Sequence, residues 1–175
     1  MRKFGVIGLP AAHSFSPAYF NQKFAEEHIQ DCIYHYYELT DLSDMYLLVS
    51  LGLVGMNITS PYKEEAVSYC DSLDDSARQI NAVNTIYISD GKMKGYNTDI
   101  YGIEQSILKE KKYITNDKCL ILGTGGASRA VTMVLKNLGY VVRQVSRTAG
   151  DLRYDELTKE IVEENGLIIN ATPIG

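Results

Sequence analysis

The sequence has few cysteines, and their spacing suits neither a disulfide framework nor a zinc site. Cys32, Cys70 and Cys119 are odd in number, far apart and outside any C-x-x-C pattern. The sequence also has no block of Lys or Arg, and its net charge at pH 7 is −5. These features argue against nucleic acid or an anionic membrane as the main partner, but they still allow a local cationic pocket for a small anion.

Long apolar runs are also missing. No run approaches the ~20 residues that a membrane-spanning helix needs. The first residues, Met1 to Gly5, lead directly into a predicted strand without the apolar region of a secretory signal peptide. We therefore expect no membrane partner and a location in the reducing cytoplasm.

The remaining composition is that of an ordinary globular chain, with 45% hydrophobic and 22% charged residues among 175. This length allows one domain or two small ones. Over residues 1–100, strand-like apolar runs alternate with stretches of helical periodicity, which predicts an α/β fold. The expected strands are residues 4–8, 33–39, 53–58, 83–88 and 92–95, the last two as a hairpin around Asp90-Gly91. The expected helices are one that begins at Pro17 and those over residues 41–51, 62–70, 74–80 and 99–112.

A second pattern of strands and helices follows. Its expected elements are a strand at 119–122, a tight turn at 123–126, a helix at 127–138, a strand at 140–145, a helix at 154–164 and a strand at 167–170. This β-α-β-α-β order corresponds to half of a doubly wound sheet. We therefore predict an N-terminal α/β domain over residues 1–100 and an incomplete Rossmann-type domain over residues 101–175.

The most informative stretch of the first domain is Asn57-Ile58-Thr59-Ser60-Pro61-Tyr62-Lys63. An apolar run ends there in hydroxyl and amide groups, and Pro61 suits the first position of the helix expected over residues 62–70. Lys63 would then lie in the first turn of that helix. The alternative is a capped helix with a solvated lysine.

Polar corners recur at the ends of the predicted strands. They are Ser14 with Ser16; Asn57, Thr59 and Lys63; Asn84 with Thr85; and Asn97, Thr98 and Asp99. Ligands of open α/β sheets collect at such strand ends, so the corners could converge on one pocket. The alternative is that Ser16, Thr98 and Asp99 only cap helices. A helix start favours a carboxylate and disfavours a cation, so Asp99 and Lys63 would make a pair suited to moving a proton.

The second domain contains the glycine-rich segment Gly123-Thr124-Gly125-Gly126-Ala127-Ser128-Arg129-Ala130 between a strand and a helix. This context is typical of a dinucleotide-binding turn, in which glycines allow close backbone approach and the helix start binds a pyrophosphate. The third small position of the usual pattern is occupied by Ser128. The alternative is a glycine-rich turn without a ligand.

The next strand ends in Ser146-Arg147-Thr148, where an NAD-binding domain would have an acidic residue for the ribose hydroxyls. An arginine with hydroxyl neighbours would instead bind a 2′-phosphate. This favours NADP over NAD. The alternative is that Arg147 is a solvated loop residue.

Taken together, these segments resemble the shikimate dehydrogenase family over the whole chain. The matching motifs, in family order and spacing, are Gly8-Leu9-Pro10, His13-Ser14-Phe15-Ser16-Pro17, Asn57-Ile58-Thr59-Ser60-Pro61-Tyr62-Lys63, Ala82-Val83-Asn84-Thr85, Gly95-Tyr96-Asn97-Thr98-Asp99, the glycine-rich segment 123–130, and Asn170-Ala171-Thr172-Pro173-Ile174-Gly175. The family interconverts 3-dehydroshikimate and shikimate with NADP in aromatic amino acid (chorismate) biosynthesis.

The resemblance implies a role for each matching residue. Lys63 would be the catalytic proton donor and acceptor, and Asp99 its acidic partner. The implied substrate contacts are Ser14 and Ser16 for the carboxylate, with Asn57, Thr59 and Asn84. The implied cofactor contacts are Gly123, Thr124, Gly125, Gly126 and Ala127 for the pyrophosphate, Ser146, Arg147 and Thr148 for the 2′-phosphate, and, more weakly, Asp75.

Three departures from the family pattern matter. Ser146 replaces a usual asparagine, and Asp151 stands where a second basic residue often completes the phosphate clamp, although Arg153 is close enough to substitute. The family's chain also continues by several tens of residues, which complete the nucleotide sheet, supply a glutamine to the substrate and return a helix to the first domain. We therefore expect a truncated chain with an exposed sheet edge that favours self-association.

Three alternatives remain open from the sequence. The chain could act on quinate, it could bind its ligands without turnover, or it could be a nucleotide-binding domain with an unrelated first half. The resemblance is compatible with a monomer or a homodimer.

Overall fold

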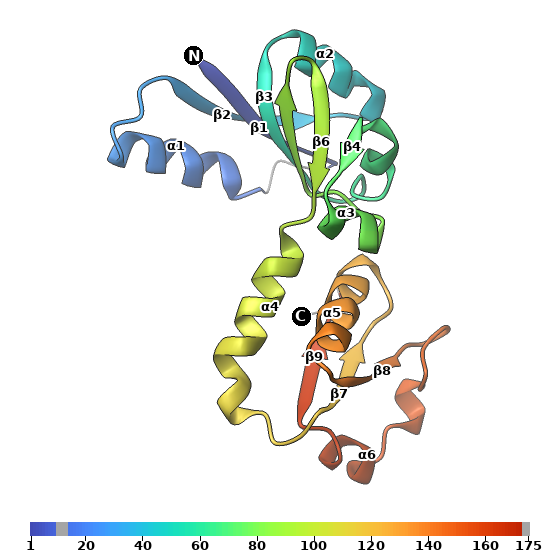
Figure 1. Ribbon diagram of the computed structural model, residues 1–175. Coiled ribbons are helices and arrows are strands. Elements are labelled where there is room, and N and C mark those ends of the chain that lie inside the picture. Colours follow the sequence, from blue (N-terminus) through green and yellow to red (C-terminus); the bar gives the residue numbers. More distant parts are fainter. Residues whose placement is uncertain (10–13, 173–175) are drawn as a thin grey trace. The chain divides into compact units, whose positions relative to one another are not determined.

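The chain forms two compact units, Met1–Thr98 and Asp99–Gly175 (Figure 1). Each unit combines helices with a β-sheet. The predicted α/β fold class is therefore confirmed. The roles expected for the two halves, in binding substrate and nucleotide, stay predictions.

The computed structural model describes residues 1–9 and 14–172. The motif residues Pro10 and His13 and the motif segment 173–175 lie outside this part of the chain. Within the described part, no helix combines the length and the apolar character that crossing a bilayer requires.

A mixed six-stranded sheet forms the centre of the first unit, with the strand order β2-β1-β3-β5-β6-β4. β1 is parallel to β2 and β3, whereas β5 is antiparallel to β3 and β6. The strands are β1 (Arg2–Gly8), β2 (Cys32–Glu38), β3 (Leu53–Ile58), β4 (Ser72–Leu73), β5 (Thr85–Ser89) and β6 (Lys92–Tyr96). The predicted hairpin is confirmed, since Asp90 and Gly91 have φ values of 52° and 72° and join β5 to β6.

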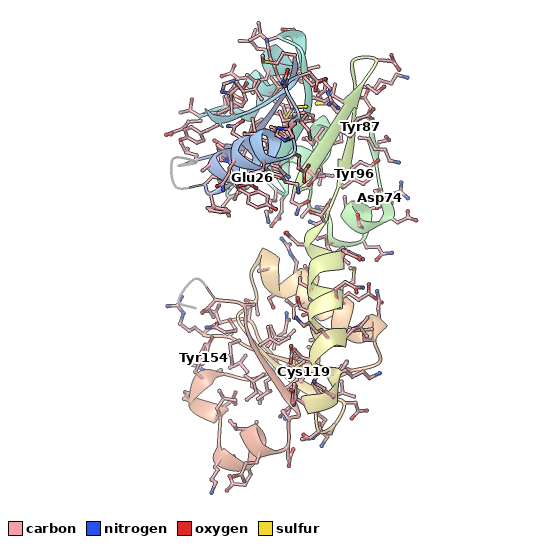
Figure 2. All side chains as sticks on the ribbon, turned by 90° about the vertical axis from the view of Figure 1, so that its left-hand side faces the viewer. Glu26, Asp74, Tyr87, Tyr96, Cys119 and Tyr154 are labelled. Atoms are coloured by element: carbon pink, nitrogen blue, oxygen red, sulfur yellow. The ribbon has the colours of Figure 1, made fainter. Side chains whose placement is uncertain are left out.

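Helices cover both faces of this sheet. They are α1 (Ser16–Glu26), η1 (Leu42–Asp44), α2 (Met45–Ser50), η2 (Glu65–Tyr69) and α3 (Asp75–Ile80), where η denotes a 3₁₀ helix. On the α1 face, Phe4, Phe20, Phe24 and Tyr34 make a run of ring contacts. Ile7 points to the opposite face, because it lies three positions after Phe4 on the same strand, and it joins the apolar core beneath α2. Figure 1 shows α1 beside β2, and Figure 2 shows Tyr87 and Tyr96 along the β5–β6 hairpin.

The predicted helix over residues 62–70 is wrong. The segment is a turn followed by the short 3₁₀ helix η2. The Lys63 carbonyl accepts a hydrogen bond from the Val83 N–H, with 2.7 Å between N and O, so it does not join an α-helical ladder. Lys63 therefore precedes η2 in a turn, and the helix-dipole argument for its acid–base role does not apply.

The second unit is built on a parallel three-stranded sheet with the order β8-β7-β9. Its elements are α4 (Asp99–Glu110), η3 (Lys111–Tyr113), β7 (Lys118–Leu122), α5 (Gly126–Asn137), β8 (Val141–Val145), η4 (Tyr154–Glu156), α6 (Lys159–Glu163) and β9 (Leu167–Asn170). Side chains of α4, α5 and the sheet share one apolar core, which includes Ile107, Cys119 and Leu135. Figure 2 labels Cys119 within this unit.

The continuous helix expected over residues 154–164 is also wrong. The segment contains η4 and α6, separated by Leu157 and Thr158. The Glu156 carboxylate accepts the N–H of Arg153, which caps the start of η4, and the Thr158 hydroxyl accepts the N–H of Ile161, which caps the start of α6. The threonine therefore acts as a new N-cap and divides the predicted helix.

Candidate functional site

A chain of hydrogen-bonded side chains crosses one edge of the first unit's sheet. Asn57, near the end of β3, is paired with Thr85 at the start of β5. Asn57 Nδ2 donates to Thr85 Oγ1 over 3.1 Å and to the Asn84 carbonyl over 3.3 Å. Thr85 Oγ1 donates in turn to Asn84 Oδ1 over 3.0 Å. The polar corners predicted at Asn57 and Asn84 therefore lie together.

Asn84 extends this chain to the segment that follows β6. Its side chain is buried, and Asn84 Oδ1 accepts the Thr98 N–H over 2.9 Å while Nδ2 donates to Thr98 Oγ1 over 3.1 Å. The neighbouring Asn97 is also buried and donates to the Ala82 carbonyl over 3.1 Å. The predicted corner at residues 97 and 98 is thus joined to Asn84 through both backbone and side chain.

Tyr34 joins the network from β2, although the sequence did not mark it as a site residue. Its hydroxyl donates to Asn57 Oδ1 over 2.7 Å. Burial raises the pKa of Tyr34 to about 12, and the Ser16 hydroxyl acts in the opposite direction. A buried tyrosine needs a partner for its hydroxyl, and this requirement was the signal that could have identified Tyr34.

Ser14 and Ser16 lie at the start of α1. The N-cap role expected for Ser16 is wrong, because Ser16 is the first residue of α1 and Phe15 occupies the cap position. The Ser14 hydroxyl accepts the Ser16 N–H over 3.4 Å, and both serines are half-buried. The two predicted carboxylate-binding serines thus lie together at the start of α1.

Thr59 and Lys63 follow β3. Thr59 is half-buried, and its N–H donates to the Ile7 carbonyl over 2.9 Å, which holds it beside the end of β1. Lys63 is half-buried as well, and its backbone is held by the Val83 N–H. Val83 directly precedes Asn84, so the turn that bears Lys63 is tied to the same segment as the polar network.

The two acidic residues from the sequence analysis occupy different surroundings. Asp99 is half-buried and is the first residue of α4, directly after Thr98 in the chain. This is the position where the free N–H groups of a helix favour an acidic side chain. Asp75 is exposed in the first turn of α3, where its carboxylate pairs with Arg78 over 2.8 Å. The side-chain hydrogen bonds described above do not include Asp75.

In the second unit, the glycine-rich segment forms the predicted tight turn between β7 and α5. Gly123 has a φ of 104°, a conformation that favours glycine, and its N–H donates to the Val145 carbonyl over 2.8 Å. Gly125 is the N-cap of α5, and a Cβ added there would meet no heavy atom within 4 Å. The side of Gly125 on which a Cβ would project therefore faces open space, which leaves room for a pyrophosphate to approach the start of α5.

Ser128 and Gln144 brace this turn from within. Ser128 is fully buried, and its hydroxyl donates to the Gly123 carbonyl over 2.7 Å. Gln144 Nε2, from β8, donates to Ser128 Oγ over 2.8 Å and to Thr132 Oγ1 over 3.1 Å. Ser128 thus has a structural function in the turn, and Gln144 is a supporting residue that the sequence analysis missed.

The segment after β8 forms a compact loop. Ser146 is buried, its hydroxyl accepts the Thr148 N–H over 3.4 Å, and it lies 3.4 Å from Thr124 Oγ1 in the glycine-rich turn. Arg147 and Thr148 are exposed, as a clamp for a phosphate would be. Ser146 therefore connects this loop with the glycine-rich turn.

Asp151 and Arg153 complete the loop. Asp151 Oδ2 accepts the Gln144 N–H over 2.7 Å, so the carboxylate is engaged with the backbone of β8. Arg153 pairs with Asp155, with 3.3 Å between Nε and Oδ1. Asp151, which departs from the family pattern, thus has a structural role in the loop. Arg153 is paired with Asp155, and this pairing opposes its use as the second basic residue of the phosphate clamp.

Residues 1–9 and 14–172 contain no cluster of three or more His, Cys, Asp or Glu side chains that could hold a metal ion. Cys32, Cys70 and Cys119 are free thiols.

Comparison with known proteins connects both units to one family. A family model described as the shikimate dehydrogenase substrate binding domain matches residues 6–86. The shikimate dehydrogenase (NADP(+)) of Clostridium beijerinckii is 34% identical over 187 residues, which cover 100% of this chain and 69% of that protein.

Solved structures agree with this result. Shikimate dehydrogenase from Aquifex aeolicus aligns with a TM-score of 0.85 and 31% identity, covering 100% of this chain and 70% of its own. Shikimate 5-dehydrogenase from Thermus thermophilus, in complex with NADP(H) and shikimate, aligns with a TM-score of 0.81 and 31% identity. The alignment covers 98% of this chain and 69% of the Thermus chain. The chain thus spans about two thirds of the length of these relatives. The chain belongs to the shikimate dehydrogenase family of oxidoreductases.

Proposed function

We propose that this chain interconverts 3-dehydroshikimate and shikimate with NADP(H), a step of aromatic amino acid biosynthesis. The first unit would bind the substrate and the second the cofactor. The names of the relatives and the substrate-binding family model over residues 6–86 support this division. The three free thiols support a cytoplasmic location.

One observation carries the proposal for the catalytic residues. The Lys63 carbonyl accepts the N–H of Val83, and the Thr98 N–H donates to Oδ1 of Asn84, the residue that follows Val83. Asp99 follows Thr98 in the chain. Two hydrogen bonds thus tie the turn that bears Lys63, and the residue that precedes Asp99, to the same segment of the first unit.

In this proposal, Lys63 donates a proton to the ketone oxygen during reduction and takes it back from the hydroxyl during oxidation. Asp99 binds a substrate hydroxyl and acts as the acidic partner of Lys63. Ser14 and Ser16 bind the carboxylate, while Asn57, Thr59 and Asn84 contribute further polar contacts. NADP(H), when bound, supplies or takes up the hydride at the carbon that carries this oxygen.

The second unit fits such a cofactor. Open space before Gly125 would admit a pyrophosphate to the start of α5, a helix of 12 residues. The exposed Arg147 and Thr148 would hold the 2′-phosphate, next to the buried Ser146. The carboxylate of Asp75 pairs with Arg78, and this pairing does not support a cofactor role for Asp75.

The test is NADPH formation from NADP⁺ and shikimate by the purified chain, together with calorimetric titration of each ligand. We expect Lys63→Ala to lower turnover by about 10²–10⁴-fold while shikimate binding remains largely intact. Lys92→Ala is the matched control, because Lys92 is an exposed lysine at the start of β6 in the same unit. We expect the control to retain wild-type turnover.

Two outcomes would change the proposal. Near-normal turnover by Lys63→Ala would exclude Lys63 as the proton donor. Shikimate and NADP⁺ binding without turnover by the wild-type chain would show a binding protein rather than an enzyme. The same assay with quinate in place of shikimate decides between these two substrates.

A further inference from the structure

Tyr34 lies at the point where an aromatic face meets the polar edge of the sheet. Its side chain is 4% exposed and stacks on Phe20, with 4.8 Å between ring centroids and 17° between ring planes. It borders a groove of about 320 Å³, whose other walls include Phe4 and Phe24 and whose polar end includes Asn57. The ring is therefore held in one orientation, and its hydroxyl is delivered to a fixed place.

The hydrogen bonds around Asn57 determine which way its amide points. Asn57 Nδ2 lies 3.3 Å from the Asn84 carbonyl oxygen, which can only accept. The nitrogen must therefore face Asn84 and Thr85, and Oδ1 must face Tyr34. Because an amide oxygen can only accept, Tyr34 gives its single proton to Asn57.

The direction of the rest of the chain follows. Asn57 Nδ2 donates to Thr85 Oγ1, and Thr85 Oγ1 donates to Asn84 Oδ1. From Tyr34 through Asn57 and Thr85 to Asn84, each group therefore donates to the next.

We propose that Tyr34 is a positioning residue for the substrate site, because it fixes the Asn57 amide from the side of Oδ1. This inference rests on the proposed function, in which Asn57 contacts the substrate. Without the phenol hydroxyl, Asn57 Oδ1 loses a hydrogen-bond donor, and the amide is held only through its Nδ2 contacts with Asn84 and Thr85.

The decisive variant is Tyr34→Phe, which retains the ring and its stacking on Phe20 but removes the hydroxyl. Its matched control is Tyr36→Phe on the same strand, because the Tyr36 hydroxyl bonds to Glu38. Circular dichroism verifies that both variants fold. Two measurements follow for each: hydrogen exchange of the Asn57 side-chain amide by NMR, and the Kd values of shikimate and NADP⁺ by calorimetry.

We expect Tyr34→Phe to exchange the Asn57 amide protons about ten-fold faster and to raise the shikimate Kd about five- to ten-fold, the loss typical of one hydrogen bond. The NADP⁺ Kd and all values of Tyr36→Phe should match the wild type. A merely structural role of the ring would leave both the exchange rate and the shikimate Kd unchanged in Tyr34→Phe.

The outcomes separate this inference from the proposed function. If the wild-type chain binds no shikimate, the proposed function falls, and with it the role of Tyr34 toward substrate; the amide exchange still decides whether Tyr34 holds Asn57. If the wild type binds shikimate and Tyr34→Phe leaves either readout unchanged, the positioning role is overturned while the proposed function stands.

Discussion

The Asp151 carboxylate accepts the backbone N–H of Gln144, with 2.7 Å between Oδ2 and N. The same Gln144 reaches through its side chain to Ser128, which holds the Gly123 carbonyl. One residue of β8 therefore connects the loop after β8 with the glycine-rich turn. An acidic residue that seemed unfavourable for a phosphate clamp thus has a role in shaping the loop.

Two substitutions at Asp151 separate its hydrogen bond from its charge. Asp151→Ala removes the acceptor for the Gln144 N–H and should lower the free energy of unfolding by about 1 kcal/mol. Asp151→Asn keeps an acceptor and removes a negative charge near the proposed 2′-phosphate site. We expect it to bind NADPH about two- to five-fold more tightly, the scale of an exposed charge interaction, with NADH affinity unchanged. Urea unfolding measures the free energy of unfolding, and fluorescence titration measures the affinities for NADPH and NADH. If the two variants had equal stability and equal NADPH affinity, this division of roles would be contradicted.

Gly150 is required by the close approach of the loop to β8. A Cβ at this position would lie 2.6 Å from the Gln144 carbonyl oxygen, 2.7 Å from the Ser146 nitrogen and 2.9 Å from the Leu152 carbonyl oxygen. Gly150→Ala must therefore shift backbone, and we expect a loss of roughly 1–3 kcal/mol in unfolding free energy and weaker NADPH binding. Gly102→Ala is the control, because a Cβ there meets no heavy atom within 4 Å and lies in α4. It should be neutral or stabilising by about 0.5–1 kcal/mol, and a Gly150→Ala variant as stable as this control would refute the argument.

The preference for NADP(H) is expected to depend on Arg147 rather than Arg153. Arg147→Gln removes the exposed cation next to Ser146 and should weaken NADPH binding about ten-fold or more, the loss typical of a hydrogen bond to a charged group. NADH lacks the 2′-phosphate, so its affinity should not change. Arg153→Gln should have little effect on either cofactor, because Arg153 pairs with Asp155. Titration of the two variants with NADPH and NADH measures these affinities. A larger loss of NADPH affinity in Arg153→Gln than in Arg147→Gln would assign the 2′-phosphate contact to Arg153.

The sequence predicted those parts of the fold that local patterns determine. The strand at residues 53–58 was found with the bounds that β3 has, because an apolar run ends there in polar residues. The helix predicted over residues 62–70 is wrong because a distant partner, Val83, takes the carbonyl of Lys63. Periodicity contains no information about such a bond.

The candidate site was predictable to the same extent. Asn57 and Asn84 were identified from motifs, and the register of β3 and β5 joins them. Tyr34 was missed because its partner Asn57 lies 23 positions away and its hydroxyl has no local signature. Gln144 was missed for the same reason, since its contact with Ser128 crosses from β8 to α5. Supporting residues of this kind depend on tertiary pairing, which a single sequence does not specify.

The raised pKa of Tyr34 predicts a specific loss of stability at alkaline pH. Burial raises this pKa from 10.0, its ordinary value, to about 12 in the folded chain. The folded state therefore favours the neutral phenol, and the resulting stabilisation is fully present below pH 10 and is lost as the pH rises toward 12. Two pKa units correspond to about 2–3 kcal/mol.

Comparing Tyr34→Phe with the wild type isolates this contribution, because the remaining tyrosines titrate equally in both. The difference in urea-unfolding free energy between wild type and variant should be constant below pH 10 and should fall by about 2–3 kcal/mol toward pH 12. If the curves of wild type and Tyr34→Phe run parallel across this range, burial does not hold the Tyr34 hydroxyl in its neutral form.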